Sequence, residues 1–569
     1  MMAGDQHDFF AELEADSDSG SDFEGFEPED IVAQEIQGNE PNEDPFENWS
    51  EGDRDAQPEL PFAGTPGLTD GLGEGQIPLH YFQTLLPGET VDTMVEETNR
   101  YGNQQLDLRQ GQLGTFSRFR KWHPTNRGEM LKFLAIVIAM GLVRQSNVTD
   151  YWSTRPVTAT PFFSSTMSRD RFLLLMSFFH LNNNARYIAR ESPGHDPLFK
   201  LGTVYSSILY KFATTYKPHQ FISVDEGMVP WRGNLAFSVY SPNKPIKYGL
   251  KAYMLCDSVS GYCLRFNLYT GRRVSLPSEH GTIYDLVMDL LRGRFGQGHV
   301  LFCDNYYSSP RLFMDLWELG VTAVGTCRKN RKGLPQQLKL KQLANKGDTY
   351  IMSTGPLSGM KYNDSNIVYI LTTSYTCENV THKQKIRPKC VVMYDKFMGG
   401  VDRSDQMVAN FRLDLKVLKW WKKVFFHILG LTVLNSYIKY KGNVRNPMTH
   451  KQFRERLVEE LVELGNICNT IPAPLPGRPK SQPLDRLTAR NHFPRKLAGI
   501  NPSARRCIVC NPAVREILAS RGEKRKRPGH ETVYFCPHCD VFLCVVPCFE
   551  IYHTNQDYIL AYKRQYSEE

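Results

Sequence analysis

The order of apolar segments between residues 219 and 330 limits the folds open to this chain more than any other feature. Three runs typical of strands come first, "QFISVD", "YGLKAYMLCD" and "YCLRFNLYTG", and the "SVSG" between the last two predicts a hairpin turn. A helix, a strand, a helix and another strand follow, in "TIYDLVMDLLRGR", "HVLFCD", "SPRLFMDLWELG" and "VTAVGT". This alternation predicts an α/β domain built around one sheet.

The same order is the opening order of an RNase H-like sheet, in which the first and fourth strands are neighbours at the centre. We expect the first strand to end at Asp225 and the fourth at Asp304, so that the two carboxylates lie side by side. Carboxylates that close repel each other unless a divalent cation holds them. Magnesium takes hard oxygen ligands and keeps positions open for phosphate and water, as phosphodiester chemistry requires. On its own, Asp304 in "VLFCDNYYSS" is also typical of an ordinary strand-to-loop turn.

A third carboxylate is expected from a helix beside the sheet. Asp402 and Asp405 in "GGVDRSDQM" are three residues apart, hence on one helical face, and the two glycines allow a close approach. Asp402 also fits a helix N-cap, or a first-turn acid favoured by the helix dipole. Asp395 competes as the third ligand, because spacing does not exclude it.

Charge is divided unevenly along the 569 residues. The net charge is +7, but residues 1–60 carry 20 acidic side chains and a single base, Arg54. That segment is therefore −19, and the remainder, as the difference from +7, is +26. An acidic segment that buries little apolar surface is predicted to be disordered. A body this basic indicates a polyanionic partner, most plausibly nucleic acid.

These patterns predict a multidomain α/β protein: an RNase H-like catalytic core with an insertion, a mainly helical DNA-binding domain and a C-terminal cross-brace-type zinc finger. The expected segments are a disordered acidic region (1–79), a helical domain in two parts (80–218 and 413–468), the catalytic domain in two parts (219–330 and 389–412), an insertion domain (331–388), a linker (469–502) and a Cys-rich zinc-binding domain (503–555). The N-terminus has no secretory signal, and the apolar run 133–143 is too short to span a bilayer, so no membrane association is expected.

Six of the 13 cysteines lie after residue 506. With one histidine they give seven predicted zinc ligands, namely Cys507, Cys510, Cys536, Cys539, Cys544, Cys548 and His553. Paired C-x-x-C motifs with later Cys and His are typical of two tetrahedral zinc sites, whereas disulfides are disfavoured in a reducing compartment. Two closed sites need an eighth ligand, which the spacing leaves open between His530 and His538. The pattern also fits a RING-like ubiquitin-ligase module or a histone-reading finger.

The chain resembles the piggyBac family of transposases from about residue 80 to 555. The resemblance rests on "ISVDEGMVPWRG", "PNKPIKYGLKAYMLCDS", "FCDNYYSSPRLF", "VGTCRKNRKGLP", "GGVDRSDQM", "LNSYI" and "CDVFLCVVPCFEIYHT". It implies that Asp225, Asp304 and Asp402 form the catalytic triad that binds Mg²⁺ or Mn²⁺, with Asp405 in support. It further implies a homodimer that cuts transposon ends in double-stranded DNA, passes through a hairpin intermediate and joins the ends to TTAA targets. It also implies that the helical domain mediates dimerisation and DNA binding.

The resemblance also selects DNA contacts among the basic and aromatic side chains near this site. The predicted contacts are Lys247, Asn305, Arg328, Arg331 and Trp420. A cationic surface binds phosphates, and an aromatic ring among lysines stacks an unpaired base. In piggyBac proteins the C-terminal finger binds transposon ends, which suits "EKRKRPGH" (523–530). That run also indicates nuclear import, so we expect a nuclear protein.

Two other functions compete with that of an active transposase. A domesticated, catalytically silent DNA-binding or chromatin protein would keep the fold without the reaction, but no predicted catalytic carboxylate is missing. A ubiquitin-ligase scaffold built around the finger leaves the triad and the basic body unexplained.

Overall fold

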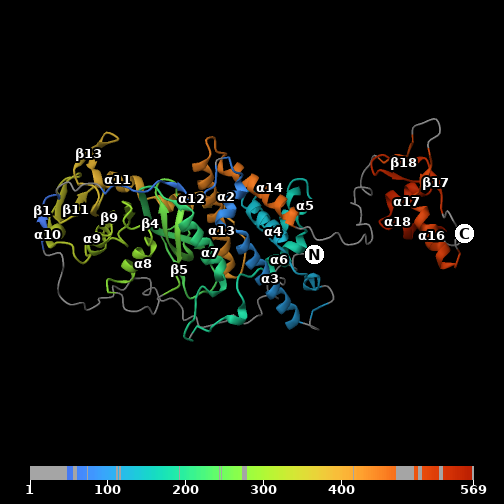
Figure 1. The fold of residues 1–569 in the computed structure, drawn as a ribbon, viewed down its shortest axis with the longest axis horizontal. Helices are drawn as coiled ribbons and strands as arrows, with labels where there is room; N and C mark the ends of the chain where they lie inside the picture. Colours follow the sequence, from blue (N-terminus) through green and yellow to red (C-terminus); the bar gives the residue numbers. More distant parts are fainter. Residues whose placement is uncertain are drawn as a thin grey trace. The chain divides into compact units, whose positions relative to one another are not determined.

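The computed structural model of the chain describes residues 48–54, 60–73, 75–109, 113–114, 117–190, 192–242, 244, 246–271, 279–413, 415–468, 492–497, 503–523 and 529–566. The chain forms two compact units, Met1–Thr470 and Ile471–Glu569. The first unit contains a ten-stranded sheet and a group of long helices, and the second is a small Cys- and His-rich module (Figure 1).

The RNase H-like order predicted for the central strands is confirmed. The elements are β4 (Phe221–Pro230), β5 (Ser238–Tyr240), β6 (Tyr248–Asp257), β7 (Cys263–Leu268), α8 (Thr282–Leu290), β8 (Val300–Cys303), α9 (Pro310–Glu318) and β9 (Thr322–Cys327). The strand order is β9-β8-β4-β6, with β7 also paired to β6. β8 runs parallel to both β4 and β9, whereas β6 and β7 are antiparallel to their neighbours. The first and fourth core strands, β4 and β8, are therefore adjacent.

The first core strand is longer than predicted. β4 does not end at Asp225 but continues to Pro230, because it stays paired with β6 beyond the last residue of β8. Asp225 is thus inside a strand, at the level where the parallel partner stops. The extra length gives Asp225 a rigid backbone on both sides.

The two faces of the central strands are buried against different helices. Leu301 and Cys303 of β8 belong to the core that includes α8 and α9. Phe302 instead packs against Phe397 of α11 (Lys389–Phe397), at a ring distance of 5.6 Å. Figure 1 shows α8 and α9 on one side of these strands and α11 on the other. Both faces are covered, as the continuous apolar runs in the sequence predict.

The segment 331–388, expected as an insertion domain, extends the central sheet. After the short helix α10 (Gln336–Leu340), strands β10 (Thr349–Thr354), β11 (Leu357–Asn363) and β12 (Ile367–Thr372) pair antiparallel in the order β10-β11-β12-β9. The hairpin β13 (Asn379–His382) and β14 (Lys385–Pro388) follows and leads into α11. The insertion therefore shares the sheet with the catalytic strands.

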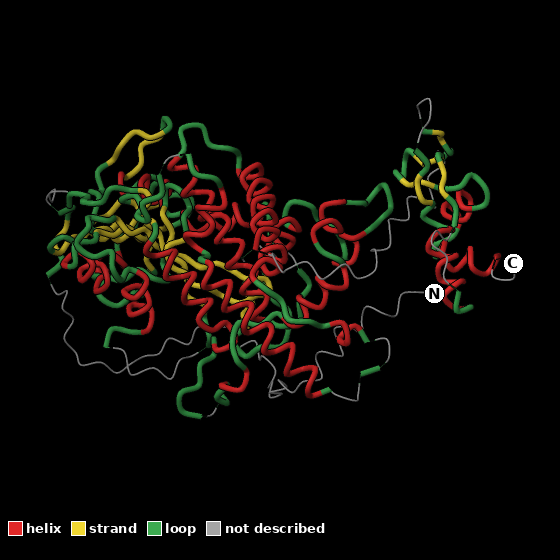
Figure 2. Tube along the Cα trace, turned by 45° about the vertical axis from the view of Figure 1, so that its right-hand side comes forward, coloured by secondary structure: helices red, strands yellow, loops and turns green. Residues whose placement is uncertain are grey.

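The two helical segments of the chain, predicted as one domain in two parts, pack together. The helices are α2 (Pro78–Leu85), α3 (Gly88–Leu108), α4 (Arg127–Met140), α5 (Pro161–Thr166), α6 (Arg169–Phe178), α7 (Gly202–Thr214), α13 (Trp420–Asn443) and α14 (His450–Cys468). α13 contacts α2, and α14 contacts α4. In Figure 2 these helices form a red group beside the yellow strands of the sheet. Within the described residues, no helix has both the length and the apolar character to cross a membrane.

The predicted disorder of residues 1–79 is wrong for the described part, which begins at residue 48. β1 (Ser50–Glu51) pairs with β10 at the edge of the sheet, and Arg54 is buried with Nη2 donating to the Ser374 carbonyl. Further along, β2 (Gly67–Leu68) pairs with β3 (Tyr216–Lys217). Composition averaged over 60 residues concealed these anchoring side chains. Residues 1–47 lie outside the described residues.

The second unit begins before the predicted finger boundary of 503 and ends after 555. Its elements are β15 (Arg495–Lys496), β16 (Arg505–Arg506), α16 (Cys510–Ser520), β17 (Glu531–Thr532), β18 (Tyr534–Cys536), β19 (Val541–Phe542), α17 (Cys548–Thr554) and α18 (Tyr558–Tyr566). β15, from the predicted linker 469–502, pairs with β18. A strand of the module was therefore assigned to the linker, because its Pro- and Arg-rich neighbours dominate the local composition.

Candidate active site and metal centres

The register of β4 and β8 brings the first two predicted carboxylates together. Val224 lies opposite Cys303 in the parallel pair, so that Asp225 and Asp304 are the next residues on adjacent chains. Phe221 of β4 and Phe302 of β8 both pack on Phe397 of α11, so their side chains lie on the face of the sheet that α11 covers. Because side chains alternate along a strand, Asp225 and Asp304 point to that same face.

Asp304 also makes the local turn that its sequence context predicts. Its Oδ1 accepts a hydrogen bond from the Tyr306 N–H at 2.9 Å, and its carbonyl accepts one from Ser308 Oγ at 2.9 Å. The turn and the site are therefore not alternatives. The hydrogen bonds hold the Asp304 carboxylate in place at the end of β8.

Burial and mutual repulsion make both carboxylates hard to ionise. Asp225 is 6% exposed, and its burial, together with the charges of Glu226 and Asp304, raises its pKa to about 6. Burial and the charge of Glu226 also raise the pKa of Asp304. Lys244 opposes both shifts, with Nζ at 3.9 Å from Asp225 Oδ2. A cation is thus already favoured at this position.

Helix α12 (Gly400–Ala409) carries the third predicted carboxylate and lies against β4 and β6. A Cβ at Gly400 would stand 2.3 Å from Ser223 Oγ, so only glycine permits this approach. Opposite, a Cβ at Gly227 would stand 3.5 Å from Asp405 Oδ1. The predicted role of the Gly pair is therefore met by Gly400, and Asp405 packs onto β4.

Asp405 is the more buried of the two α12 acids. Its burial raises its pKa to about 7, and the charges of Asp402 and Asp225 act in the same direction. Its Oδ1 is buried and has no hydrogen-bond partner within the part of the chain that the structure describes. An unpartnered buried carboxylate oxygen is costly, so this atom is suited to a cation.

Asp402 lies on the exposed side of the first turn of α12. Across the described residues, Asp225, Asp304 and Asp402 are not among the groups whose ligand atoms all lie within 4.8 Å of one another. The structure thus makes Asp225 and Asp304 neighbours and packs Asp405 against β4, and Asp402 lies one helical turn before Asp405. The competing candidate Asp395 is half exposed and ion-paired with Arg387 Nη1 at 2.7 Å.

Two residues of this site were missed by the sequence reasoning, Glu226 and Gly227. Both follow Asp225 on β4, where the strand was expected to have ended. Glu226 pairs with Lys251, at 3.0 Å between Oε1 and Nζ, and its charge acts on Asp225 and Asp304. The apolar residues after "ISVDEG" were the available signal that the strand continues.

Three of the predicted DNA contacts lie together beside Asp304. Arg328 Nε donates to Asn305 Oδ1 at 3.4 Å, and Arg331 Nη2 donates to the Asn305 carbonyl at 2.5 Å. Both arginines follow β9, so the sheet delivers them to the same edge as the carboxylate. Lys247 is exposed immediately before β6.

The two adjacent tryptophans at the start of α13 differ in their surroundings. Trp421 is 3% exposed and packs on Phe179, as a core residue does. Trp420 is only partly buried, with its ring edge-to-face on Phe237 at 5.2 Å. Trp420 is therefore the one of the pair with a ring surface left for another molecule.

The second unit gathers its cysteines and histidines into two groups of four. The first group is Cys507, Cys510, Cys544 and Cys548. Cys510 Sγ and Cys544 Sγ are 4.0 Å apart, and two thiolates on one tetrahedral zinc ion lie about 3.8 Å apart. Hydrogen bonds with Cys510 and Cys548 lower the pKa of Cys507, whereas the pKa values of Cys510 and Cys548 are raised by interaction with the other thiols and by burial, and that of Cys544 by burial and by interaction with the other thiols. The four sulfur atoms are therefore close enough to act on one another. The residues therefore fit a structural zinc ion.

The second group is His492, Cys536, Cys539 and His553. The distances from His492 Nδ1 to Cys536 Sγ and Cys539 Sγ are 3.3 and 3.5 Å, and Cys539 Sγ is 3.7 Å from His553 Nε2. Sulfur and nitrogen ligands of one zinc ion lie about 3.6 Å apart. The other nitrogen of His553 bonds the Phe549 carbonyl at 2.7 Å, which orients the ring as in many zinc sites.

Neither of the two candidates left open for the eighth ligand, His530 and His538, is in either group. His530 contributes only its backbone, whose N–H donates to Cys510 Sγ. His492 completes the set because β15, three residues later, pairs with β18 and brings it to Cys536. Along the chain the two groups alternate, so the cross-brace pattern is confirmed.

The comparisons with known proteins agree with the fold of the central sheet. The family described as Transposase IS4, of piggyBac type, matches residues 77–437. The chain belongs to the piggyBac family of transposases.

Two human proteins and one solved structure illustrate the relationship. PiggyBac transposable element-derived protein 3 of Homo sapiens is 26% identical over 448 residues, covering 74% of this chain and 69% of that protein. PiggyBac transposable element-derived protein 5 of Homo sapiens is 23% identical over 465 residues, covering 76% and 84%. The piggyBac transposase of a synaptic complex with hairpin DNA superposes with a TM-score of 0.64 at 23% identity, over 78% of this chain and 96% of that one. This similarity extends to the fold of most of the chain.

Membership of this family implies the use of a divalent metal ion. DDE-type transposases use divalent metal ions. Asp225, Asp304 and the α12 acids offer the hard oxygen atoms that Mg²⁺ prefers, and the buried Oδ1 of Asp405 lacks another partner among the described residues. The residues present therefore fit a divalent cation.

Proposed function

We propose that this chain is a cut-and-paste DNA transposase that cleaves DNA strands at transposon ends and joins them to TTAA targets through a hairpin intermediate. The observation that best supports the proposal is the β4–β8 register, which makes neighbours of Asp225 and Asp304 on a family-typical sheet. Burying two carboxylates with raised pKa values costs folding free energy, and such pairs are typical of functional sites.

In this proposal, Asp225, Asp304 and Asp402 hold the catalytic ions, and Asp405 anchors α12 to β4 beside them. Bound divalent cations supply activation of the attacking oxygen and neutralisation of charge on the leaving oxygen. Asp402 completes the site from the solvent side when DNA is bound, and its exposure in the first turn of α12 supports this role. Asn305, Arg328 and Arg331 lie beside Asp304 and position the phosphate backbone for in-line attack.

The remaining parts of the proposal concern partners and location. We infer a homodimer on double-stranded DNA, with the two zinc groups of the second unit folding a module that binds terminal repeats. Lys247 and Trp420 are the further DNA contacts, since both present side-chain surface to solvent. A nuclear location rests on "EKRKRPGH", of which residues 524–528 lie outside the described residues.

The test is a nicking and strand-transfer assay on the full chain. The DNA carries the inverted repeats that flank the gene, bounded by TTAA, and products are resolved on denaturing gels. We expect Mg²⁺-dependent nicks, then hairpins, then joining to a TTAA plasmid, all abolished by chelation. Asp225→Asn should remove every product.

The same assay decides between this proposal and a catalytically silent DNA-binding protein. A chain that binds the repeats tightly but yields no nick with Mg²⁺ or Mn²⁺ is a DNA-binding protein that has kept the fold. Products whose formation is insensitive to chelation would contradict the metal assignment.

A further inference from the structure

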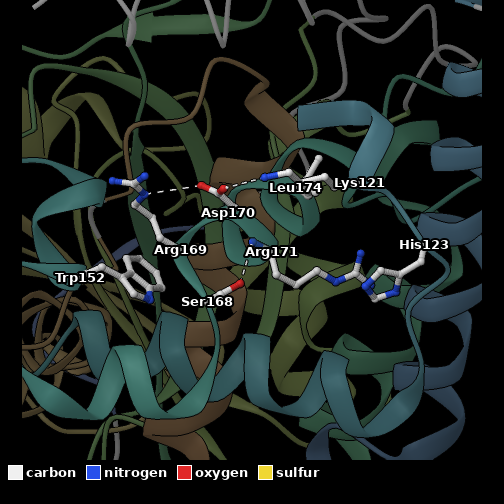
Figure 3. Close-up of a pocket in the computed structure, with 8 residues that line it drawn as sticks. All are labelled: Lys121, His123, Trp152, Ser168, Arg169, Asp170, Arg171 and Leu174. Atoms are coloured by element: carbon white, nitrogen blue, oxygen red, sulfur yellow. Dashed lines mark hydrogen bonds and ion pairs between the residues drawn. The ribbon is translucent and has the colours of Figure 1, made fainter. Parts of the chain in front are cut away.

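A pocket of about 470 Å³ opens in the helical part of the first unit, at the start of α6. We name it the α6 pocket; its main lining residues are Lys121, His123, Trp152, Arg169, Asp170 and Arg171 (Figure 3). None of these belongs to β4, β8 or α12, so the pocket is separate from the carboxylate site. Its volume is in the range of small-ligand sites.

Cations outnumber anions in and around this pocket. Asp170 is shared by Arg118 Nε at 4.0 Å, Lys121 Nζ at 3.6 Å and Arg169 Nε at 3.6 Å. These separations exceed hydrogen-bond lengths, so one carboxylate loosely balances three cations. A second anion would therefore be attracted here.

Arg171 adds a buried donor that points to the same kind of ligand. Its side chain is 8% exposed and pairs with Glu129 through Nε and Nη2 at 2.7 and 2.6 Å. Its Nη1 is buried without a hydrogen-bond partner in the described residues. Figure 3 shows the guanidinium reaching beside His123 at one end of the pocket. The guanidinium also lies over the Trp122 ring, with Cζ 4.8 Å from the ring centroid. A buried donor without a hydrogen bond is costly, and an acceptor from a ligand would remove that cost.

The backbone at the N-terminus of α6 also favours an anion in this pocket. α6 runs for 10 residues from Arg169, with Ser168 as its N-cap. The N-terminus of a helix carries a partial positive charge and free N–H groups, which suit phosphate. The helix end, the surplus cations and Arg171 converge on one place, and together they predict an anion site.

Trp152 gives the pocket an aromatic wall. Its Nε1 donates to the Met167 carbonyl at 2.8 Å, and its ring packs on Phe163 and Phe172 at 5.9 and 5.0 Å. The ring is thus held fixed while it also lines the pocket. A rigid aromatic surface next to a phosphate site is the combination that binds a nucleotide of an unpaired strand.

We propose that the α6 pocket binds one nucleotide of the DNA, with its phosphate at Lys121, Arg169 and Arg171 and its base against Trp152. This inference rests on the proposed function, in which DNA is the substrate, and it names a binding site remote from the reacting phosphate. The pocket would hold an unpaired nucleotide while strands are cut and exchanged elsewhere on the same unit.

The phosphate half of the proposal is tested with Lys121→Gln/Arg169→Gln. Both side chains are at least half exposed, at 68% and 50%, so the fold should persist. Binding of a fluorescent single-stranded oligonucleotide is measured by anisotropy over a range of salt, without divalent metal. We expect the salt slope of log K to fall by about 1. The matched control Arg186→Gln/Arg190→Gln removes two exposed charges of the same domain. An equal fall in the control would overturn the pocket assignment.

The base half is tested with Trp152→Leu on two strands of equal length, one normal and one abasic. We expect about fivefold to hundredfold weaker binding of the normal strand, and no change for the abasic strand, because only the base stacks. Equal losses on both strands would overturn the stacking role.

Two further outcomes separate this proposal from its premises. If the parent protein binds no DNA, the proposed function fails; if it binds and the pocket variants bind equally, only the pocket assignment fails. The acidic residues 1–47 are the rival occupant. If that segment occupies the pocket, deleting residues 1–47 should raise the DNA affinity of the parent protein but not that of Lys121→Gln/Arg169→Gln. That result would overturn the nucleotide assignment.

Discussion

The molecule contains two kinds of candidate metal site, and they differ in how far the chain assembles them. In the second unit, eight side chains form two groups with their ligand atoms within 4.8 Å of one another. In the first unit, Asp225 and Asp304 are neighbours, but Asp402 is exposed on another element and Lys244 lies close by. The Cys and His ligands of the second unit are fully assembled, whereas the carboxylates of the first unit are not gathered around one position.

The difference follows from charge and from task. Thiols are neutral until metal binding displaces their protons, and neutral imidazoles bind metal through a nitrogen lone pair, so both can be gathered at little electrostatic cost. Carboxylates repel, which the raised pKa values of Asp225 and Asp405 reflect. A structural zinc site is closed and supports folding, whereas a catalytic magnesium site must admit phosphate and water. The predictions below separate these two roles.

The largest effect should come from removing the zinc ligands. Cys536→Ser/Cys539→Ser should unfold residues 492–566, because structural zinc contributes about 10–16 kcal/mol to such modules. Limited proteolysis should then degrade this unit while leaving the first unit intact. Specific binding to transposon ends should fall as well.

Cys468→Ser is the control for this experiment, since Cys468 is exposed at the end of α14 and belongs to neither group. It should leave protease resistance and zinc content unchanged. A Cys536→Ser/Cys539→Ser protein that bound transposon ends as tightly as the parent would show that the finger has another role.

The next largest effect concerns the eighth ligand. His492→Ala should lower the zinc content from two ions to one per chain, because it removes a ligand from one group only. His538→Ala is the matched control: its ring lies 4.8 Å from that of His492 but outside both groups. Zinc release measured with a colorimetric chelator decides the matter, and loss of zinc from His538→Ala instead would reverse the assignment.

The carboxylate site should respond in its rate rather than in its fold. Asp225→Asn, Asp304→Asn and Asp402→Asn should each reduce strand cleavage by about 10²–10³ or more, because removing a preorganised electrostatic group alone costs that much. DNA affinity should persist or rise, since Lys and Arg make the phosphate contacts. Asp395→Asn should cleave normally, because the native Asp395 is paired with Arg387 and is not a predicted ligand. A dead Asp395→Asn beside an active Asp402→Asn would show that the third ligand is wrong.

The same variants carry a pH prediction for stability. The pKa of Asp225 is raised from 3.8 to about 6 in the fold, so its contribution to stability is present below pH 3.8 and is lost as the pH rises through 6. Asp225→Asn should therefore be at least as stable as the parent at pH 8 without metal, with the difference shrinking toward pH 4. Thermal melts at both pH values check this. A cysteine variant of the finger should instead be less stable than the parent protein.

The sequence was most informative where periodicity and order carried the structure. The β-β-β-α-β-α-β order sufficed to place β4 beside β8 and hence Asp225 beside Asp304. It did not reveal that β4 continues to Pro230, because that extension depends on pairing with β6. Nor did it place the strands of residues 331–388, because polar residues such as Ser358 and Lys361 are buried within β11 and hide the apolar pattern.

Contacts between distant segments were the parts that could not be predicted. His492 becomes a ligand only through the pairing of β15 with β18 across a long separation. Arg54 and Asp70 lie in a segment whose composition indicates disorder, yet Arg54 is buried and Asp70 pairs with the fully buried Lys439. The average charge of a segment does not show which of its single residues pack against or pair with the rest of the protein.

The smallest expected effect belongs to Lys244, and it tests the difference between the open and closed sites most directly. Its Nζ lies 3.9 Å from Asp225 Oδ2 and 3.2 Å from the Glu226 carbonyl, and its charge lowers the pKa values of Asp225, Asp304 and Asp405. Without metal it acts as the counter-ion of the site, so a divalent cation must compete with it. Lys244→Gln should bind Mn²⁺ about fivefold more tightly or less, because a partly exposed pair is worth about 1 kcal/mol at most.

Titration calorimetry without DNA measures this change, and Lys247→Gln is the control, an exposed lysine three residues away. Lys247→Gln should leave Mn²⁺ affinity unchanged, while both variants should weaken DNA binding by a similar small factor. Weaker Mn²⁺ binding by Lys244→Gln would mean that the lysine assembles the carboxylates instead of competing for them. The catalytic site would then be held together by the chain itself, as the zinc groups are, and the distinction between the two units would disappear.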